Sequence, residues 1–226
     1  MSRRAPPRTA DDAVPPPPAP ARERDKERDQ SRPRLRLEVD ERRAQLLALA
    51  LRTFAERSYD EVSIDELARA AGVSKGLVYH YFPAKRDLYV AALREAARQL
   101  LEVTASDPAA PPPARVRRGL ESYLGFVEAH GPAYVALMRG GIGSDPEVFA
   151  VIEGTRQTFL DRVLDGTPPE LDSPMVRMAL RGFIGFVEAT SLDWVARRSM
   201  PRERLVDLCA AVLFDMVARA SALPPT

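Results

Sequence analysis

Residues 71–82, AGVSKGLVYHYF, constrain the fold more than any other stretch of this chain. Just before them, Ser63 is followed three residues later by Glu66 and an apolar stripe, a capping-box pattern that begins a helix. Gly72 tolerates the positive φ that a sharp turn between two helices requires, and Ser74 is suited to cap the next helix. The sequence therefore predicts a helix that ends at Gly72, a tight turn and a second helix.

The second of these helices is expected to have one buried and one exposed face. Val78 and Phe82 lie four residues apart and, with Val73 just before the helix, can share the inward side. The residues near the N-terminal end or on the outward face are Lys75, Gly76, Leu77, Tyr79 and His80. In a helix-turn-helix, side chains at these places reach the phosphates and base edges of the DNA major groove.

The segment after the second helix also has features of an anion site. Pro83 suits the first position of a further helix, where its missing N–H costs nothing. Lys85 would then lie in the first helical turn, beside N–H groups that favour a phosphate. Small three-helix units also serve as plain packing modules, with aromatic residues at their boundary. The run Tyr79, His80, Tyr81 favours DNA contact, because successive helix positions point about 100° apart and the three rings are hard to bury together.

Residues 54–93, FAERSYDEVSIDELARAAGVSKGLVYHYFPAKRDLYVAAL, resemble the N-terminal DNA-binding domain of TetR-family transcriptional regulators. The resemblance rests on features in the same order: a Phe-x-x-x-x-Tyr helix end, the Ala-Gly-Val-Ser turn, a Tyr-x-Tyr-Phe end and a following Lys-x-x-Leu. It implies phosphate contacts from Ser63, Ser74, Tyr79 and Lys85. It implies base or groove contacts from Lys75, Gly76, Leu77 and His80.

Two positions depart from the family pattern. Ser58 stands where the family usually has Gly, so a polar cap is expected at the end of the first helix. Leu77 stands where Thr is common, which replaces a hydroxyl by an apolar group suited to a thymine methyl. The resemblance therefore implies the mode of DNA binding but not the operator sequence.

Composition excludes several other classes of protein. The chain of 226 residues has a formal net charge of +1 and a single cysteine, Cys209, so no internal disulfide is possible. His80, His130 and Cys209 have no metal-ligand spacing, and no cofactor is expected. The sequence has no G-x-S-x-G, phosphate-loop or paired-carboxylate motif, so an enzyme is not expected. Without a secretory signal or membrane-span pattern, a cytoplasmic protein with no membrane partner is expected.

The chain is expected to have three parts. Residues 1–37 are Pro/Arg-rich with few apolar residues, and a disordered arm is expected there. Its basic end, SRPRLRL, is either a DNA-contacting arm or a solvated tail without a role. Residues 38–84 are expected to form the helix-turn-helix DNA-binding domain. Residues 85–223 are expected to form a helical ligand-binding and dimerisation domain.

Helical periodicity with clear interruptions continues along the rest of the chain, so the fold class is all-α: an N-terminal three-helix helix-turn-helix domain plus a larger C-terminal helical domain. From residue 40, an apolar stripe recurs at Leu47, Ala50, Leu51 and Phe54. Later helices are expected over residues 83–104, 114–129, up to 138, 147–164, 175–198 and 201–221.

The helix expected over residues 175–198 is apolar nearly all round and must be covered on more than one side. Within one subunit it is simply core. In the family that the chain resembles, this helix and the next pack against the same pair of a second subunit, which implies a homodimer. The residues expected at that interface are Phe186, Leu205, Leu208, Val212, Leu213 and Met216.

Apolar residues of the C-terminal helices are candidates to line a ligand cavity, although each is also an ordinary core residue. These candidates are Tyr123, Phe126, Met138, Phe149, Ile152, Phe159, Phe183 and Trp194. A polar group within the cavity is expected from Arg156, Asp193 or His130. Arg156 has apolar neighbours and would need an anionic partner if buried, either Glu128 or Glu188 or a ligand carboxylate.

The resemblance implies a regulator that binds double-stranded operator DNA and responds to an unknown small-molecule effector. We expect a repressor that a small, largely apolar effector releases from its operator, by favouring a conformation in which the two DNA-binding domains leave half-site spacing. An activator or co-repressed regulator of the same fold is the alternative, as is an architectural DNA binder without effector.

Overall fold

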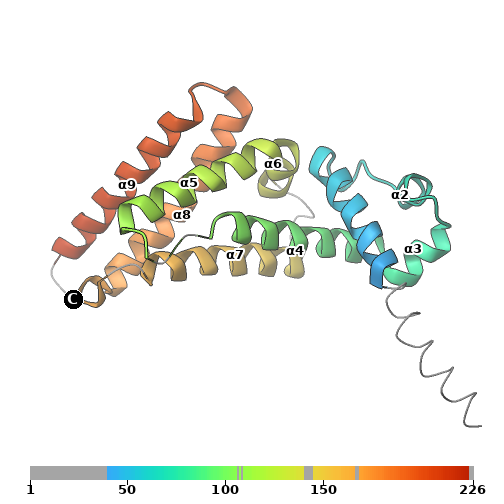
Figure 1. Cartoon of the computed structure of the whole chain (residues 1–226), viewed down its shortest axis with the longest axis horizontal. Helices are drawn as coiled ribbons and strands as arrows, with labels where there is room; N and C mark the ends of the chain where they lie inside the picture. Colours follow the sequence, from blue (N-terminus) through green and yellow to red (C-terminus); the bar gives the residue numbers. More distant parts are fainter. Residues whose placement is uncertain (1–39, 106, 108, 140–144, 166–167, 224–226) are drawn as a thin grey trace, which may run out of the picture. The chain divides into compact units, whose positions relative to one another are not determined.

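The computed structural model describes residues 40–105, 107, 109–139, 145–165 and 168–223. The chain divides into two units, residues 1–42 and 43–226. In the first unit only residues 40–42 are described, and they are helical, so the predicted N-terminal arm lies outside the described residues. The second unit contains all the elements below, and its described residues form helices and turns without a strand (Figure 1). The predicted all-α class is confirmed.

Local capping signals begin both helices of the helix-turn-helix. Residues 43–56 are helical, followed by α2 (Ile64–Ala70) and α3 (Lys75–Tyr81). The Ser63 Oγ accepts the Glu66 N–H at 3.1 Å, and the Ser74 Oγ accepts the Leu77 N–H at 3.1 Å. Gly72 has a φ of +65°, the conformation that favours glycine. These contacts confirm the turn predicted from the sequence, although the Glu66 carboxylate binds Arg57 and not the N-cap backbone.

The core of this domain forms where the three helices meet. The helix at residues 43–56 buries Leu46, Ala50 and Phe54, while Leu47 and Leu51 of the predicted stripe are half-buried. Val78 is fully buried and Phe82 nearly so, as predicted. The buried face is therefore rotated slightly from the predicted one. Leu46 and Leu47 are adjacent, and helical periodicity fits either of them as the buried residue almost equally well.

Helix α4 (Lys85–Val103) begins two residues later than predicted. Pro83 lies outside it, and Ala84 is the N-cap, whose N–H donates to the Asp87 Oδ2 at 3.0 Å. Phe82, the residue before the proline, is extended with φ −135° and ψ 97°. A residue before proline disfavours the helical region, so the chain leaves α3 extended and re-enters a helix only after Ala84.

The remaining helices follow with short connections: α5 (Pro112–Ala129), α6 (Gly131–Arg139), α7 (Pro146–Leu164), a 3₁₀ turn at Pro169–Leu171, α8 (Pro174–Arg197) and α9 (Arg202–Ala222). Helices α5, α7 and α8 begin one or two residues before the predicted starts, each with proline in the first turn, where the missing N–H breaks no helical bond. None of the described helices is both long and apolar enough to cross a membrane.

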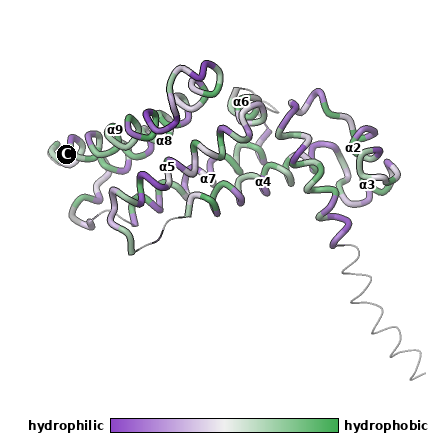
Figure 2. Tube along the Cα trace, turned by 45° about the horizontal axis from the view of Figure 1, so that its top comes forward, coloured by the Kyte–Doolittle hydropathy of each residue, from purple (hydrophilic) through white to green (hydrophobic). Residues whose placement is uncertain are grey.

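Helix α8 packs against α9, and α4 lies beside α7 (Figure 1). Hydrophobic and hydrophilic residues alternate along α4, α5 and α7, as expected for helices with one buried face (Figure 2). The C-terminal core centres on fully buried Leu124 of α5, Val176 of α8 and Val206 of α9. At the α8 end, the Trp194 indole N–H donates to the Met200 carbonyl at 2.8 Å and closes the turn into α9.

Two residues predicted at a dimer interface belong to this core. Leu205 and Leu213 are each 2% exposed and pack inside the subunit, so the prediction was wrong for them. Leu208 is 44% exposed, while Phe186, Val212 and Met216 are half-buried. Because α9 is apolar on most of its surface, helical periodicity alone did not distinguish its inner from its outer face.

Candidate DNA-binding surface and effector cavity

The residues predicted to contact DNA lie at the surface of α2, α3 and the start of α4. Those that are exposed are Ser63, Ser74, Lys75, Gly76, Tyr79 and His80. Leu77 and Lys85 are half-buried. The two serines use their hydroxyl oxygens as N-caps, so their own N–H groups and hydroxyl hydrogens remain available to a phosphate.

Lys75 forms an exposed ion pair with Asp65, and 2.8 Å separates its Nζ from the Asp65 Oδ2. The hydrogen bond to Asp65 raises the pKa of Lys75, so the amine remains charged at neutral pH. Exposed ion pairs contribute little to stability. A DNA phosphate can therefore replace Asp65 as the partner of this ammonium group at low cost.

Aromatic rings hold two other polar groups in place. The Lys85 Nζ lies 4.2 Å from the centroid of the Tyr59 ring, a cation–π contact at the start of α4. The His80 ring packs edge-to-face against Tyr81 at 5.3 Å.

Ser58, which departs from the family pattern, forms a polar end to the first helix. Its N–H and its hydroxyl both donate to the Glu61 Oε2, at 2.9 and 2.8 Å.

A cavity of about 620 Å³, within the size range of small-molecule sites, is lined by helices α4 to α9 and by side chains from residues 51–59. Most of its lining is apolar. Seven of the predicted residues line it: Tyr123, Phe126, Met138, Ile152, Arg156, Phe159 and Phe183. His130 also lines it, and its Nδ1 lies 2.8 Å from the Phe126 carbonyl oxygen.

Three predicted residues lie elsewhere. Phe149 is 63% exposed, because Val148, one position earlier and about 100° round the helix, occupies the buried place. Trp194 is buried against α9, with the Arg198 guanidinium 4.8 Å from its ring centroid. Asp193 pairs with Arg197 on the outside of α8. None of the three lines the cavity.

The polar groups in the middle of the cavity satisfy one another. Arg156 donates from Nε and Nη2 to the two carboxylate oxygens of Glu188 at 2.8 and 2.7 Å. Its third partner is Glu153, which also binds Arg181. The partner of Arg156 is thus internal and is Glu188, because Glu128 pairs instead with Arg198 and Arg202.

Two tyrosines add a second polar pair that the sequence did not single out. The hydroxyls of Tyr123 and Tyr134 lie 2.6 Å apart. Burial raises the pKa of Tyr123 well above its usual range and that of Tyr134 to about 12, so both remain neutral at physiological pH. Tyr134 went unrecognised because α6 is short and its single aromatic residue gives no periodic signal.

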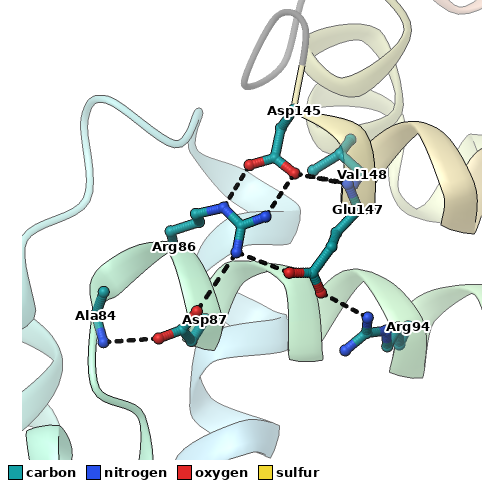
Figure 3. A network of polar contacts seen from close by, with 7 residues as sticks. All are labelled: Ala84, Arg86, Asp87, Arg94, Asp145, Glu147 and Val148. Atoms are coloured by element: carbon teal, nitrogen blue, oxygen red, sulfur yellow. Dashed lines mark hydrogen bonds and ion pairs between the residues drawn. The ribbon is translucent and has the colours of Figure 1, made fainter.

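An ion-pair network joins the start of α4 to the start of α7 (Figure 3). Arg86 donates to both carboxylate oxygens of Asp145, with Nη2 and Oδ1 2.9 Å apart, and its Nη1 donates to the Glu147 Oε1 at 2.9 Å. Arg94, two turns further along α4, donates to the Glu147 Oε2 at 2.7 Å. We call these four residues the α4–α7 network.

Asp145 of the α4–α7 network is also the N-cap of α7. Its side chain is 8% exposed, and its Oδ1 accepts the N–H groups of Glu147 and Val148. The hydrogen bond from Arg86, followed by those backbone N–H groups, holds the pKa of Asp145 below its usual range. The network therefore remains ionised at neutral pH.

Apolar packing reinforces the same connection. Val148 of α7 is 4% exposed and belongs to the cluster that contains Phe82 of the DNA-binding domain and Leu88 of α4. Leu137 of α6 and Ile152 of α7 pack against this cluster and also line the cavity. The elements that enclose the cavity thus contribute directly to the core beneath α3.

Two family models match the chain: residues 46–92 match bacterial regulatory proteins of the tetR family, and residues 112–215 match the tetracyclin repressor-like C-terminal domain. The HTH-type transcriptional activator FasR of Mycolicibacterium smegmatis is 31% identical over 182 residues, which cover 76% of this chain and 78% of the relative. The chain belongs to the TetR family. It is therefore a DNA-binding transcriptional regulator and not an enzyme.

Solved structures agree with this TetR-family assignment. A tetR-family transcriptional regulator from Streptomyces coelicolor is 36% identical, with a TM-score of 0.71 over 82% of this chain and 90% of that one. FadR of Bacillus subtilis, solved in complex with stearoyl-CoA, is 20% identical, with a TM-score of 0.58 over 77% of this chain and 97% of that one. At that identity the second comparison shows a shared fold only.

We expect Lys75→Ala to weaken binding to all DNA, and to lower the salt dependence of binding by about one counterion, if the ammonium contacts a phosphate. If it contacts a base, the preference at one operator position relaxes instead. Fluorescence anisotropy with operator and random DNA over a range of salt concentrations separates the two.

Arg118→Ala is the matched control, because Arg118 is an exposed cation on α5, outside the DNA-binding domain. It should leave DNA binding unchanged. If Lys75→Ala changes neither affinity, salt dependence nor base preference, α3 is not the element that reads DNA.

Proposed function

We propose that this protein is a homodimeric repressor that leaves its operator when a largely apolar effector with a long aliphatic chain fills the cavity. The observation that carries the proposal is the cavity itself, which is mostly apolar and is lined in part by α4, α6 and α7, helices that also pack in or against the core of the DNA-binding domain. An architectural DNA binder without effector has no use for such a cavity.

The chemistry of the lining favours an aliphatic ligand. Burial of each CH₂ group contributes about 0.8 kcal/mol, so a long chain can reach micromolar affinity without any polar contact. FadR of Bacillus subtilis, which has the same fold, was solved in complex with stearoyl-CoA. This supports a cavity of this architecture as a site for a long acyl chain.

Helix α4 provides the physical connection between effector and DNA. Its first turns bury Leu88 and Tyr89 in the DNA-binding core, and its later turns place Ala97 and Leu100 in the cavity wall. The α4–α7 network fixes the start of α4 to α7, another wall of the cavity. A ligand that prefers a different spacing of α4 and α7 shifts the population towards a conformation that no longer fits the operator.

The proposed dimer uses the outer faces of α8 and α9. Apolar or small exposed residues share one face of α8, namely Met175, Met178, Gly182, Gly185 and Ala189. Leu208 and Ala211 are exposed on α9. Met178 is 71% exposed in the single subunit, and glycine allows a second helix to approach closely.

An activator is the second candidate, because the relative FasR of Mycolicibacterium smegmatis is named an activator. In an activator the same cavity and the same connection through α4 would act in the opposite direction: the effector would strengthen operator binding. The direction of the effector's effect therefore decides between the two.

We expect long-chain fatty acids and acyl thioesters to lower operator affinity in proportion to chain length. Gly119→Phe should remove this response, because Gly119 lines the cavity and a side chain there meets open space. Gly154→Phe is the control: Gly154 is exposed on α7 and does not line the cavity. Gel shifts with a chain-length series test this. A response that survives in Gly119→Phe would place the effector elsewhere.

We expect Asp145→Asn to uncouple the two domains, because Arg86 loses its bidentate anionic partner while α7 keeps a capping side chain. The variant should bind operator but show a smaller effector-induced change, and its urea midpoint should fall. Asp172→Asn breaks an exposed pair with Arg177 and serves as control.

The pH dependence of the α4–α7 network has a defined sign. The folded-state pKa values of Asp145 and Glu147 are lowered. The stabilisation by the network is therefore complete above the unfolded-state pKa values and is lost only as pH falls through the lower folded-state values. Between pH 8 and pH 6, the urea midpoints of wild type and of Asp145→Asn should therefore change by the same amount. A larger fall for wild type over this range would contradict the prediction.

We expect Leu208→Asp to convert the dimer to a monomer and to weaken operator binding, because a charge would be buried at the α8–α9 face. Phe149→Asp is the matched control, since Phe149 is also exposed but lies on α7. Sedimentation velocity at micromolar concentration measures both. A wild-type protein that sediments as a monomer would exclude the proposed dimer.

A further inference from the structure

We propose that the end of the cavity lined by Thr104, Arg115 and Arg162 binds the anionic head group of an amphiphilic effector, a carboxylate or a phosphate. The aliphatic tail then lies along α4 towards Tyr89. This inference rests on the proposed function, because it assigns a chemical class to the ligand and an orientation to it within the cavity.

The charges of the cavity wall carry the inference. Four arginines line the cavity, Arg57, Arg115, Arg156 and Arg162, against a single carboxylate among the described lining residues, that of Glu188. Two of the four are neutralised within the protein: Arg57 pairs with Glu66, and Arg156 pairs with Glu188 and Glu153.

The other two arginines have no carboxylate partner in the part of the chain that the structure describes. Arg115 and Arg162 are both half-buried, and neither is paired with any acidic side chain that the structure describes. A half-buried cation without a counter-charge loses hydration without compensation. An anion of the ligand supplies that compensation.

Arg162 is also held in a fixed position. Its Nη1 donates to the Thr104 Oγ1 at 3.1 Å, and its guanidinium lies 5.9 Å from the centroid of the Phe159 ring. Thr104 is only 6% exposed, and its hydroxyl donates to the Leu100 carbonyl at 2.6 Å, which fixes the oxygen that Arg162 contacts. The remaining N–H groups of the guanidinium form the planar fork that matches carboxylate or phosphate oxygens.

The lining of the cavity separates an end with unpaired charges from an apolar wall along α4. Tyr89 of α4 and Thr104, the C-cap of that helix, both line it and lie fifteen residues apart. At a rise of 1.5 Å per residue, the lining along α4 extends for about 22 Å. Between the two ends, the α4 wall consists of small and apolar residues, Ala92, Leu93, Ala96, Ala97 and Leu100. A ligand with one anionic end and a long aliphatic tail matches this distribution.

The test compares ligands that differ only in head charge. Hexadecanoic acid, its uncharged methyl ester and hexadecyl phosphate are titrated calorimetrically into the full-length protein below their micelle concentrations. We expect the two anions to bind about tenfold or more tightly than the ester, since charge-assisted hydrogen bonds are the stronger kind. Whichever anion binds more tightly identifies the carboxylate or the phosphate as the preferred head group.

The double variant Arg115→Gln, Arg162→Gln should lose this preference and bind acid and ester alike, with ester affinity unchanged. The control Arg117→Gln, Arg118→Gln changes two exposed arginines of α5 that do not line the cavity and should keep the preference. Operator binding without ligand, measured for every variant, verifies that each is folded.

Two results would overturn the proposal, and they differ in meaning. If wild type binds acid and ester equally, or if the double variant loses affinity for both equally, the head-group site is wrong while the apolar effector cavity stands. If neither anion nor ester binds and operator affinity does not respond, the proposed function fails as well.

Discussion

The pairing of Arg86 with Asp145 is the contact on which the arrangement of the two helical regions depends. Asp145 accepts two hydrogen bonds from the guanidinium and two from the first turn of α7, so one carboxylate both begins a helix and fixes α4 against it. A bidentate ion pair has a defined geometry, unlike apolar packing, which tolerates sliding. Loss of either partner would leave α7 held against α4 by the Arg94–Glu147 pair and by the packing of Val148 and its neighbours.

The polar groups inside the cavity show how an apolar site tolerates charge. Arg156 is satisfied by Glu188 and Glu153, and the Tyr123 and Tyr134 hydroxyls satisfy each other. Because these groups already have partners, an aliphatic chain that lies against them leaves no hydrogen-bond donor or acceptor without a partner. The middle of the cavity is therefore compatible with apolar ligands despite the number of polar atoms in its wall.

Local signals in the sequence predicted local structure well. Ser63, Gly72 and Ser74 act within a few residues of themselves, and their capping and turn roles were confirmed. Adjacent apolar residues were harder: the sequence alone does not decide whether Phe149 or Val148 turns inward, nor that Leu205 is buried while Leu208 is exposed. That choice is made by the neighbouring helices, and the sequence does not contain their positions.

Most contacts between distant positions were beyond such reasoning, although the sequence did offer Glu188 as one of the possible partners of Arg156. Arg86 and Asp145 lie 59 residues apart, and each alone resembles an ordinary surface charge. Likewise, nothing in the sequence distinguishes Arg115 and Arg162 from other arginines, and only the structure shows that they line the cavity. The candidate DNA-binding residues came from a recurring motif and seven of the cavity residues from apolar patterning, whereas Tyr134, Arg115 and Arg162 required the fold.

The exposed pair of Lys75 with Asp65 has a consequence for how the regulator searches a genome. If Lys75 contacts a phosphate, the carboxylate of Asp65 beside it repels the DNA backbone, at a small cost because the pair is exposed. This cost applies equally to every sequence, whereas compensation from base contacts is available only at the operator. With Lys75 at the phosphate as proposed, the pair slightly shortens residence on random DNA, so the regulator spends less time at the many sites that it must reject.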